Sequence, residues 1–380
     1  MKILVAGDYC PKLRVKECLN NADFASILGD VLPYTKSSDF SIVNFESNIS
    51  NPTDRKIKKH GPNLCTEPRA IEALKWAGFN VVTLANNHIF DFGQEGIERT
   101  ISILKNNCIE YVGGGHNQKE AGRILYLEKN GETLAIINAC EHEFSIADQT
   151  QGGANGIDPI DMYESIQSAK NNADYVVVIT HGGHELFKLP SLRMKKLFHF
   201  FIDIGADAVI NHHQHCYSGK EIYNDRPIYY GLGNFIFDYK KRNNNSMVHE
   251  GFMVQLDLNK NCISSSEVPY VQCSEKVGIK IIDNTSNFSH DFANLSRIIS
   301  DSNLLKKQVE QYYENEITSI LLQFQPYNNR ILNYLFFKGL LPNVYTQNKL
   351  FAIRNMIECE SHYDKLVFAI NKLSTDGVTN

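Results

Sequence analysis

Residues 206–215 read Ala-Asp-Ala-Val-Ile-Asn-His-His-Gln-His, so an apolar run ends directly in a row of amide and imidazole side chains. A short aliphatic run with such polar flanks is typical of a buried β-strand. The same succession recurs in the first two thirds of the chain. It is found at residues 2–8, 39–46, 80–88 and 175–181. This recurrence predicts a buried sheet whose strand ends carry reactive side chains.

Helical patterns lie between the predicted strands, and hairpin signals follow them. The helix-like segments are residues 67–77, 96–105 and 191–204. Asn130-Gly131 separates two extended runs and is a favoured pair for a type I′ turn, and Asn224-Asp225 has the same place in a later hairpin. Strands that alternate with helices favour a parallel sheet, and hairpins add antiparallel strands. We therefore predict a mixed α/β sheet with covering helices.

The character of the sequence changes near residue 285. Beyond it, Asn, Lys, Leu and Ile are frequent, and apolar residues such as Leu305, Val309 and Tyr312 recur at helical spacing. We predict one domain over residues 1–285 and a helical C-terminal appendage over residues 286–380. The appendage either packs on the first domain or binds a protein partner, and the pattern does not decide between the two.

Composition and charge exclude several classes of protein. With 380 residues, of which 43% are hydrophobic and 21% charged, the chain can form a packed core and is not disordered as a whole. Its net charge of −5 argues against a nucleic-acid-binding protein. Its nine cysteines include no C-x-x-C pair, which disfavours a cysteine-rich zinc site and a disulfide scaffold. We find neither a signal peptide nor the roughly 18 apolar residues of a membrane span, and we expect a cytoplasmic protein.

Residues that can bind a metal lie at every predicted strand end. They are Asp8, Glu46, Asn87 with His88, His181, and His213 with His215. Ligands bind where the carboxyl ends of parallel strands meet, so we expect these side chains to converge. In extended backbone, residues i and i+2 also face the same side, as His213 and His215 then would. Taken singly, each residue has a structural alternative, such as a turn cap at Asp8.

Carboxylates and imidazoles together suit Mn²⁺, Fe or Zn²⁺. Two such ions about 3.5–4 Å apart can activate water and stabilise an in-line displacement at phosphorus. The convergence of the strand ends therefore predicts one or two divalent ions and a hydrolytic reaction.

The order of these motifs resembles the CapA family, the capsule and poly-γ-glutamate biosynthesis proteins related to the calcineurin-like metallophosphoesterases. The resemblance covers about residues 2–260. It rests on Val5-Ala6-Gly7-Asp8, Val43-Asn44-Phe45-Glu46, Leu84-Ala85-Asn86-Asn87-His88 with Asp91-Phe92-Gly93, His181-Gly182-Gly183-His184-Glu185, the 205–215 segment, and Gly231-Leu232-Gly233-Asn234-Phe235. The A-N-N-H…D-x-G and G-L-G-N-F strings are the most specific of these.

The resemblance implies a four-layer αββα fold with the site at the edge of the sheets. It implies these ligands: Asp8 and His215 for one ion, Asn87, His181 and His213 for the other, and Glu46 between them. His88 would be the catalytic residue, either as general acid on the leaving oxygen or bound to a phosphate oxygen. Glu185 would orient a ligand or touch substrate, with a surface salt bridge as the alternative, and Asn234 would have a similar supporting place.

Two departures from the phosphoesterase pattern affect the first ion, and a third, Glu46 in place of an aspartate, lengthens the side chain between the ions by one methylene group and would alter their spacing. The D-x-H motif reads Asp8-Tyr9-Cys10, and the G-H-x-H motif has His212 in place of glycine. Cys10 could supply a thiolate, but a buried inert thiol is the favoured interpretation. A single-ion site is therefore an alternative to a pair of ions.

These observations lead to three hypotheses about function. The preferred one is a metal-dependent hydrolase of phosphoesterase type that acts on an anionic small molecule or polymer of capsular polysaccharide or poly-γ-glutamate metabolism. The alternatives are a non-catalytic accessory protein that binds an anionic polymer in capsule assembly, and a γ-glutamyl amide hydrolase. Two further segments lie after predicted strands without specific support for a role: the basic run 54–60, interpreted as a solvated loop, and residues 141–143.

Overall fold

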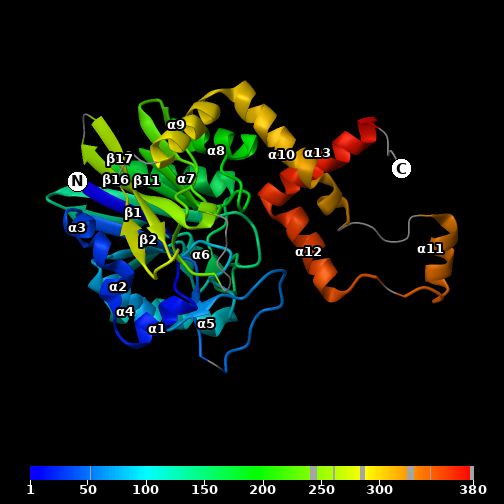
Figure 1. Cartoon of the computed structure of the whole chain (residues 1–380), viewed down its shortest axis with the longest axis horizontal. Helices are drawn as coiled ribbons and strands as arrows, with labels where there is room; N and C mark the ends of the chain where they lie inside the picture. The colour runs from blue at the N-terminus through cyan, green and yellow to red at the C-terminus, as the bar shows by residue number, and fades with distance from the viewer. Residues whose placement is uncertain are drawn as a thin grey trace.

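A computed structural model describes residues 1–51, 53–239, 246–259, 262–282, 287–322, 329–342 and 344–376 (Figure 1). The predicted boundary between residues 285 and 286 lies outside the described residues. The chain forms an α/β body followed by a helical C-terminal part, as the sequence predicts.

The first large sheet has the strand order β18-β17-β16-β1-β2-β5-β6, and β15 also pairs with β1. Its parallel part contains the predicted strands near the N-terminus, and its antiparallel part comes from later in the chain. The strands are β1 (Lys2–Cys10), β2 (Phe40–Phe45), β5 (Val81–Thr83), β6 (Glu110–Val112), β15 (Asn234–Phe237), β16 (Glu250–Asn259), β17 (Cys262–Gln272) and β18 (Ile279–Ile281).

The second large sheet has the order β13-β14-β12-β11-β9-β8. Its strands are β8 (Leu125–Lys129), β9 (Glu132–Cys140), β11 (Tyr175–His181), β12 (Ala208–His212), β13 (Lys220–Tyr223) and β14 (Arg226–Tyr229). Both predicted hairpins are present, because Asn130 and Gly131 have φ of 53° and 80°, and Asn224 and Asp225 have φ of 48° and 60°. Positive φ at both central residues is the signature of a type I′ turn. Two small ribbons pair β3 (Asn48–Ile49) with β4 (Cys65–Thr66), and β7 (Gly114–Gly115) with β10 (Gly153–Ala154).

The alternation of side chains along β1 produces the layers. Ile3 and Val5 belong to the core that the two large sheets share, whereas Leu4 and Ala6 pack with helices on the outer face of the first sheet. Helices of that outer layer are α1 (Arg14–Asn20), α2 (Phe24–Leu28), α3 (Leu32–Lys36), α4 (Arg69–Trp76) and α5 (Gly93–Asn106). The opposite layer, on the second sheet, is α7 (Pro159–Asn172) and α8 (Leu192–Asp203). The predicted αββα architecture is confirmed; α6 (Gln118–Ala121) and the short 3₁₀ turns at Gly29–Val31 and Ser246–Val248 connect elements.

The C-terminal part consists of helices, and it packs on the α/β body. Its helices are α9 (Asn287–Ser300), α10 (Ser302–Leu322), α11 (Arg330–Phe337), α12 (Gln347–Glu358) and α13 (Glu360–Asp376). Phe288, Phe292 and Ile299 of α9 join the main hydrophobic core, and Tyr312 of α10 stacks on Phe187 at 4.0 Å between ring centroids. Figure 1 shows α11 apart from the α/β body. Within the described residues, no helix is both long and apolar enough to cross a bilayer.

Candidate metal centre

The predicted ligands lie at the carboxyl ends of parallel strands from both large sheets. Asp8 sits in β1 at an irregularity in the pairing with its neighbours β2 and β15, and Glu46 follows β2 directly. Such irregularities re-aim side chains next to functional sites. Glycine at position 7 allows the backbone of β1 to approach the backbone at Gly233 closely, because a Cβ at Gly7 would lie 2.0 Å from the carbonyl oxygen of Gly233. His181 is the last residue of β11 in the opposite sheet.

His213 and His215 converge for a different reason from the one predicted. We expected extended backbone, but β12 ends at His212, and His213 and His215 have φ of 95° and 55°. Residues other than glycine adopt this left-handed backbone region only at a cost in free energy. Such strain persists where the surrounding structure fixes the backbone in that conformation. The strained turn places the two imidazoles 6.2 Å apart between ring centroids. A tertiary constraint, not strand periodicity, therefore orients this pair.

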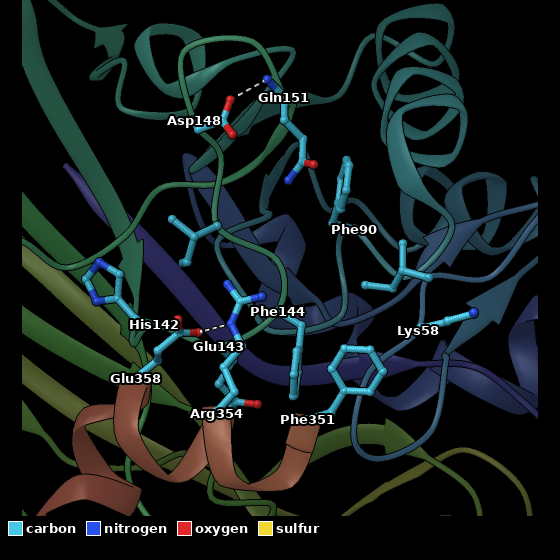
Figure 2. Close-up of a pocket in the computed structure, with 12 residues that line it drawn as sticks. Lys58, Phe90, His142, Glu143, Phe144, Asp148, Gln151, Phe351, Arg354 and Glu358 are labelled. Carbon is cyan, nitrogen blue, oxygen red and sulfur yellow. Dashed lines mark hydrogen bonds and ion pairs between the residues drawn. The ribbon is translucent and has the colours of Figure 1, made fainter. Parts of the chain in front are cut away.

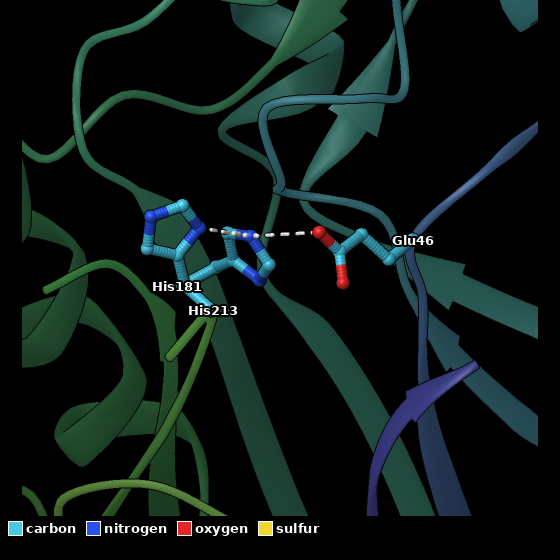
Figure 3. A group of neighbouring side chains, drawn as sticks. All are labelled: Glu46, His181 and His213. Carbon is cyan, nitrogen blue, oxygen red and sulfur yellow. Dashed lines mark hydrogen bonds and ion pairs between the residues drawn. The ribbon is translucent and has the colours of Figure 1, made fainter. Parts of the chain in front are cut away.

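One group of ligand atoms joins Glu46 with His181 and His213 (Figure 3). Oε1 of Glu46 lies 3.8 Å from Nε2 of His181, and Nδ1 of His213 lies 3.0 Å from the same nitrogen. The amide oxygen of Asn87 lies 3.1 Å from Nε2 of His181. All the predicted ligands of the second ion, Asn87 included, therefore point at one small volume. We call these side chains, with Glu46, the imidazole half of the centre.

A second group joins Glu46 with Asp8 and His215, and we call it the aspartate half. Nδ1 of His215 lies 3.7 Å from Oδ2 of Asp8, and its Nε2 lies 3.7 Å from Oε1 of Glu46. Asn234 is in contact with this half, because its Oδ1 lies 2.9 Å from Nδ1 of His215. Asn234 therefore contacts a candidate ligand, and its supporting role stays a prediction. The two halves share Glu46, the residue predicted to lie between the ions.

The chemistry of these side chains fits a divalent cation. Within each group of three, the ligand atoms lie within 4.8 Å of one another. Both carboxylate oxygens of Glu46 are buried and have no hydrogen-bond partner among the described residues. Burial raises the pKa of Glu46 well above its ordinary value, and the neighbouring Asp8 carboxylate raises it further. Because an unpaired buried carboxylate is strongly destabilising, this site favours occupation by a cation.

His88 is held beside Glu46 by a buried carboxylate. Its Nδ1 lies 2.7 Å from Oδ2 of Asp91, and its Nε2 lies 4.0 Å from Oε1 of Glu46. Burial lowers the pKa of His88, and the ammonium of Lys59 lowers it further while Asp91 opposes them. Lys59 also forms an ion pair with Asp91. The ring is thus oriented with Nε2 toward the ligand cluster, and it lies outside both ligand groups.

Asp91 and Lys59 were not identified as functional from the sequence. Asp91 was part of a quoted family string, which was a usable signal. Lys59 lies in the basic run that we interpreted as a solvated loop, and for this residue the interpretation was wrong, since its side chain is only 2% exposed. Asn44 was also missed. Its amide nitrogen donates to Oδ1 of Asp8 at 2.8 Å and lies 3.2 Å from Nδ1 of His181.

Two of the three departures from the phosphoesterase pattern fall on the aspartate half. Cys10 is buried, and burial raises the pKa of its thiol to about 12, so the sulfur stays protonated at neutral pH. Neither group of candidate ligands includes Cys10. His212 is buried with Nδ1 3.4 Å from Oδ1 of Asp8. An imidazole therefore occupies space beside Asp8 where the resemblance expects a glycine.

Glu185 lies at the solvent-exposed edge of the centre. Its negative charge contributes to the raised pKa of Glu46, so it is close enough to act on the ligands electrostatically. The described residues provide no ion pair for it, which disfavours the salt-bridge alternative.

A cavity of about 640 Å³ lies beside the centre (Figure 2). Its walls come from the segment after β9, from Phe90 two residues beyond His88, and from α12. Phe144 and Phe351 lie next to each other in its lining, with Arg354 beside them and Lys58 farther along the wall. Glu143 lines the cavity and also lies 3.8 Å from His213, so the cavity adjoins the metal centre.

Known proteins share the sequence pattern of the α/β body. The family described as Bacterial capsule synthesis protein PGA_cap matches residues 2–239. The capsule biosynthesis protein CapA of Bacillus anthracis is 34% identical over 246 residues, which are 63% of this chain and 60% of the relative. The PGA biosynthesis protein CapA of Bacillus subtilis (strain 168) is 31% identical over 272 residues, which are 71% of this chain and 70% of the relative.

Among solved structures, a putative 5'-nucleotidase from Staphylococcus aureus in complex with alpha-ketoglutarate superposes with a TM-score of 0.46 at 15% identity. The superposition covers 79% of this chain and 58% of that one. The aligned part spans about 60% of the Bacillus anthracis relative.

Proposed function

The chain belongs to the bacterial capsule synthesis protein family PGA_cap, and from this premise we propose that it is a metal-dependent hydrolase of phosphoesterase type. Its substrate would be an anionic small molecule or polymer of capsular polysaccharide or poly-γ-glutamate metabolism. The observation that carries the proposal is Glu46, whose two buried and unpaired carboxylate oxygens lie between two groups of metal-ligand side chains.

The proposed ligands form two sets, one for each ion. Asp8 and His215 would hold one divalent ion, and Asn87, His181 and His213 would hold the other, with Glu46 contributing to both. When bound, Mn²⁺, Fe or Zn²⁺ supplies Lewis-acid charge for a phosphoryl oxygen and lowers the pKa of water. Asn44 orients both halves, because its amide group bridges Asp8 and His181.

His88 is the proposed proton donor. Asp91 accepts the hydrogen bond from Nδ1 and so fixes the plane of the ring. Nε2 then faces the space beside Glu46. In the imidazolium form, which carries a second proton on Nε2, the ring can give that proton to the leaving oxygen of the substrate. Lys59 holds Asp91 in place through their buried ion pair.

The cavity beside the centre is the proposed place for the rest of the substrate. Its volume of about 640 Å³ is within the range of small-molecule pockets. Lys58 can pair with an acidic group, and the phenylalanine rings can pack against methylene groups. Arg354 already pairs with Glu358 at 2.8 Å, so this ion pair would have to open before Arg354 binds a substrate. This combination suits a ligand in which charges and short apolar segments alternate.

The test combines metal analysis with hydrolysis assays. We expect freshly purified protein to contain a transition metal at up to two ions per chain, and to hydrolyse aryl phosphomonoesters or diesters with added Mn²⁺. The variant His88→Ala should lose turnover by about 10²- to 10⁴-fold and keep its metal. Absence of bound metal together with absence of turnover under Mn²⁺, Fe²⁺ and Zn²⁺ contradicts the proposal.

A second candidate is a non-catalytic accessory protein that binds an anionic polymer during capsule assembly. The inert Cys10 and the His212 ring beside Asp8 favour it, because both weaken the aspartate half. Binding of poly-γ-glutamate without turnover of any ester supports this candidate. Faster cleavage of a γ-glutamyl peptide than of an aryl phosphate points to the amide hydrolase instead. The cytoplasmic location and a protein partner for the C-terminal helices stay predictions.

A further inference from the structure

Residues 141–143, directly after β9, are held by the C-terminal part of the chain. Glu141 is buried and accepts hydrogen bonds from Oγ of Ser361 at 2.6 Å and from the backbone nitrogen of Gly183 at 3.0 Å. Arg193 of α8 pairs with the same carboxylate, and it also bonds Asp364 at 3.0 Å. The carboxylate of Glu141 is therefore fixed from both sides of the boundary between the α/β body and α13.

The next residue is fastened in the same way. The backbone nitrogen of His142 donates to Oε2 of Glu360 at 2.9 Å, and its Nδ1 lies 2.5 Å from Oε1 of the same carboxylate. Glu360 and Ser361 are the first two residues of α13. The start of this helix thus fixes both residues that precede Glu143.

Glu143 faces the metal centre from this fixed segment. Its Oε1 lies 3.8 Å from Nε2 of His213, and its side chain is only 10% exposed. The other ring nitrogen of His213, Nδ1, faces His181 at 3.0 Å. Nδ1 is therefore the nitrogen directed at the ligand cluster, and Nε2 is directed at the carboxylate. A histidine that binds a metal through one nitrogen usually donates its other N–H to a carboxylate or carbonyl group.

We propose that Glu143 is a positioning residue for His213, and that the first residues of α13 hold Glu143 in place. The inference rests on the proposed metal centre and deepens it. It assigns the C-terminal helices a part in metal binding, although they lie beyond residues 2–239 that the family matches. Through this contact Glu143 favours the tautomer of His213 that carries its proton on Nε2, and it orients the plane of the ring.

The first experiment measures binding of Mn²⁺ to metal-free protein by titration calorimetry, without substrate. We expect Glu143→Gln and Glu143→Ala to weaken one of the binding events by about 10- to 100-fold. The matched control is Asp148→Asn, since Asp148 is another carboxylate of the same cavity whose partners are Thr150 and Gln151. Equal affinities for wild type and both Glu143 variants overturn the inference.

A second readout does not depend on turnover or on binding strength. Long-range ¹H–¹⁵N spectra of the imidazoles report which ring nitrogen of His213 carries the proton. We expect Nε2–H in the wild type, and a changed signal or mixed tautomers in Glu143→Ala. An unchanged His213 signal overturns the positioning role. Thermal melts of each variant show that it is folded.

The part played by α13 is tested by the double variant Glu360→Gln, Ser361→Ala. It should weaken the same Mn²⁺ binding event that Glu143→Ala weakens, but by a smaller factor. If Glu143→Ala weakens binding and the double variant does not, the role of α13 is refuted. Wild-type protein that binds Mn²⁺ but hydrolyses nothing refutes the proposed hydrolase and leaves this inference standing.

Discussion

The two halves of the candidate centre share Glu46 but differ in what surrounds their other ligands. Amide groups support both halves, because Asn44 contacts Asp8 and His181, and Asn234 contacts His215. In the imidazole half, the carboxylate of Glu143 also lies 3.8 Å from His213. In the aspartate half, an inert thiol replaces the missing imidazole, and His212 lies against Asp8.

This difference shows that the effect of a departure from a family pattern depends on which half of the centre the changed residue belongs to. The departures at Cys10 and His212 act on one half, whereas the third departure, Glu46, is shared by both halves. His181 and His213, the other ligands of the imidazole half, match the pattern. We therefore expect unequal affinities, with a tightly bound ion in the imidazole half and a weaker one in the aspartate half. The predictions below test this asymmetry.

The largest effect is expected from Glu46→Gln, which removes the ligand that both halves use. Binding of both ions should weaken by more than about 100-fold, since outer partners alone contribute about 10- to 100-fold. The metal-free variant should be more stable than wild type by about 1–3 kcal/mol, because a neutral amide replaces a buried carboxyl group that has no hydrogen-bond partner. Metal analysis and thermal melts check this, with Asp148→Asn, an exposed carboxylate outside both ligand groups, as the control. An unchanged metal content speaks against a shared ligand.

The next prediction compares one imidazole from each half. His181→Ala should remove the tight ion and abolish hydrolysis, whereas His215→Ala should keep about one ion per chain. The measurement is metal content after dialysis at a fixed free Mn²⁺ concentration. Equal losses in the two variants contradict the proposed asymmetry.

Tighter binding of the ion in the aspartate half is expected from His212→Gly, which restores the glycine of the phosphoesterase pattern. Removing the ring 3.4 Å from Oδ1 of Asp8 should strengthen the weaker binding event by about tenfold, or about 1.4 kcal/mol. The variant should lose about 1 kcal/mol of stability, because glycine is unfavourable in a strand. Calorimetry resolves the weaker event; an unchanged weaker affinity rules out obstruction by His212.

The smallest effect is expected from Cys10→Ala, which removes a side chain outside both ligand groups. Metal binding should stay unchanged, and stability should fall by about 1 kcal/mol through lost burial.

The pH dependence gives a second check on Cys10. Burial raises the pKa of this thiol to about 12, against about 8.5 in an unfolded chain. The contribution of this pKa difference to the free energy of unfolding therefore has its full value below about pH 8.5. It is lost as the pH rises from there toward 12. Cys10→Ala should lack this alkaline loss, which melts between pH 8 and pH 10 measure. Rapid reaction of Cys10 with a thiol reagent at pH 8 contradicts a buried thiol.

Much of the fold could be predicted because its signals are local. The aliphatic runs became β1, β2, β5, β11 and β12 with shifts of one or two residues. The dipeptides Asn130-Gly131 and Asn224-Asp225 gave both hairpins, since few residues tolerate the positive φ that these turns require. The helical appendage was also predicted, but its position was not, because an apolar helix face does not reveal what it packs against.

The sequence by itself determined which residue types end the strands, and therefore that carboxylates and imidazoles would meet at one edge of the sheets. Only the tertiary structure decided how they meet. It placed Asn44 between Asp8 and His181, buried Lys59 beside Asp91, and brought the start of α13 to the segment that carries Glu143. The physical reason is that strand and turn preferences act between near neighbours. Contacts between residues some 200 positions apart in the sequence depend instead on the packing of the whole chain, which no local pattern encodes.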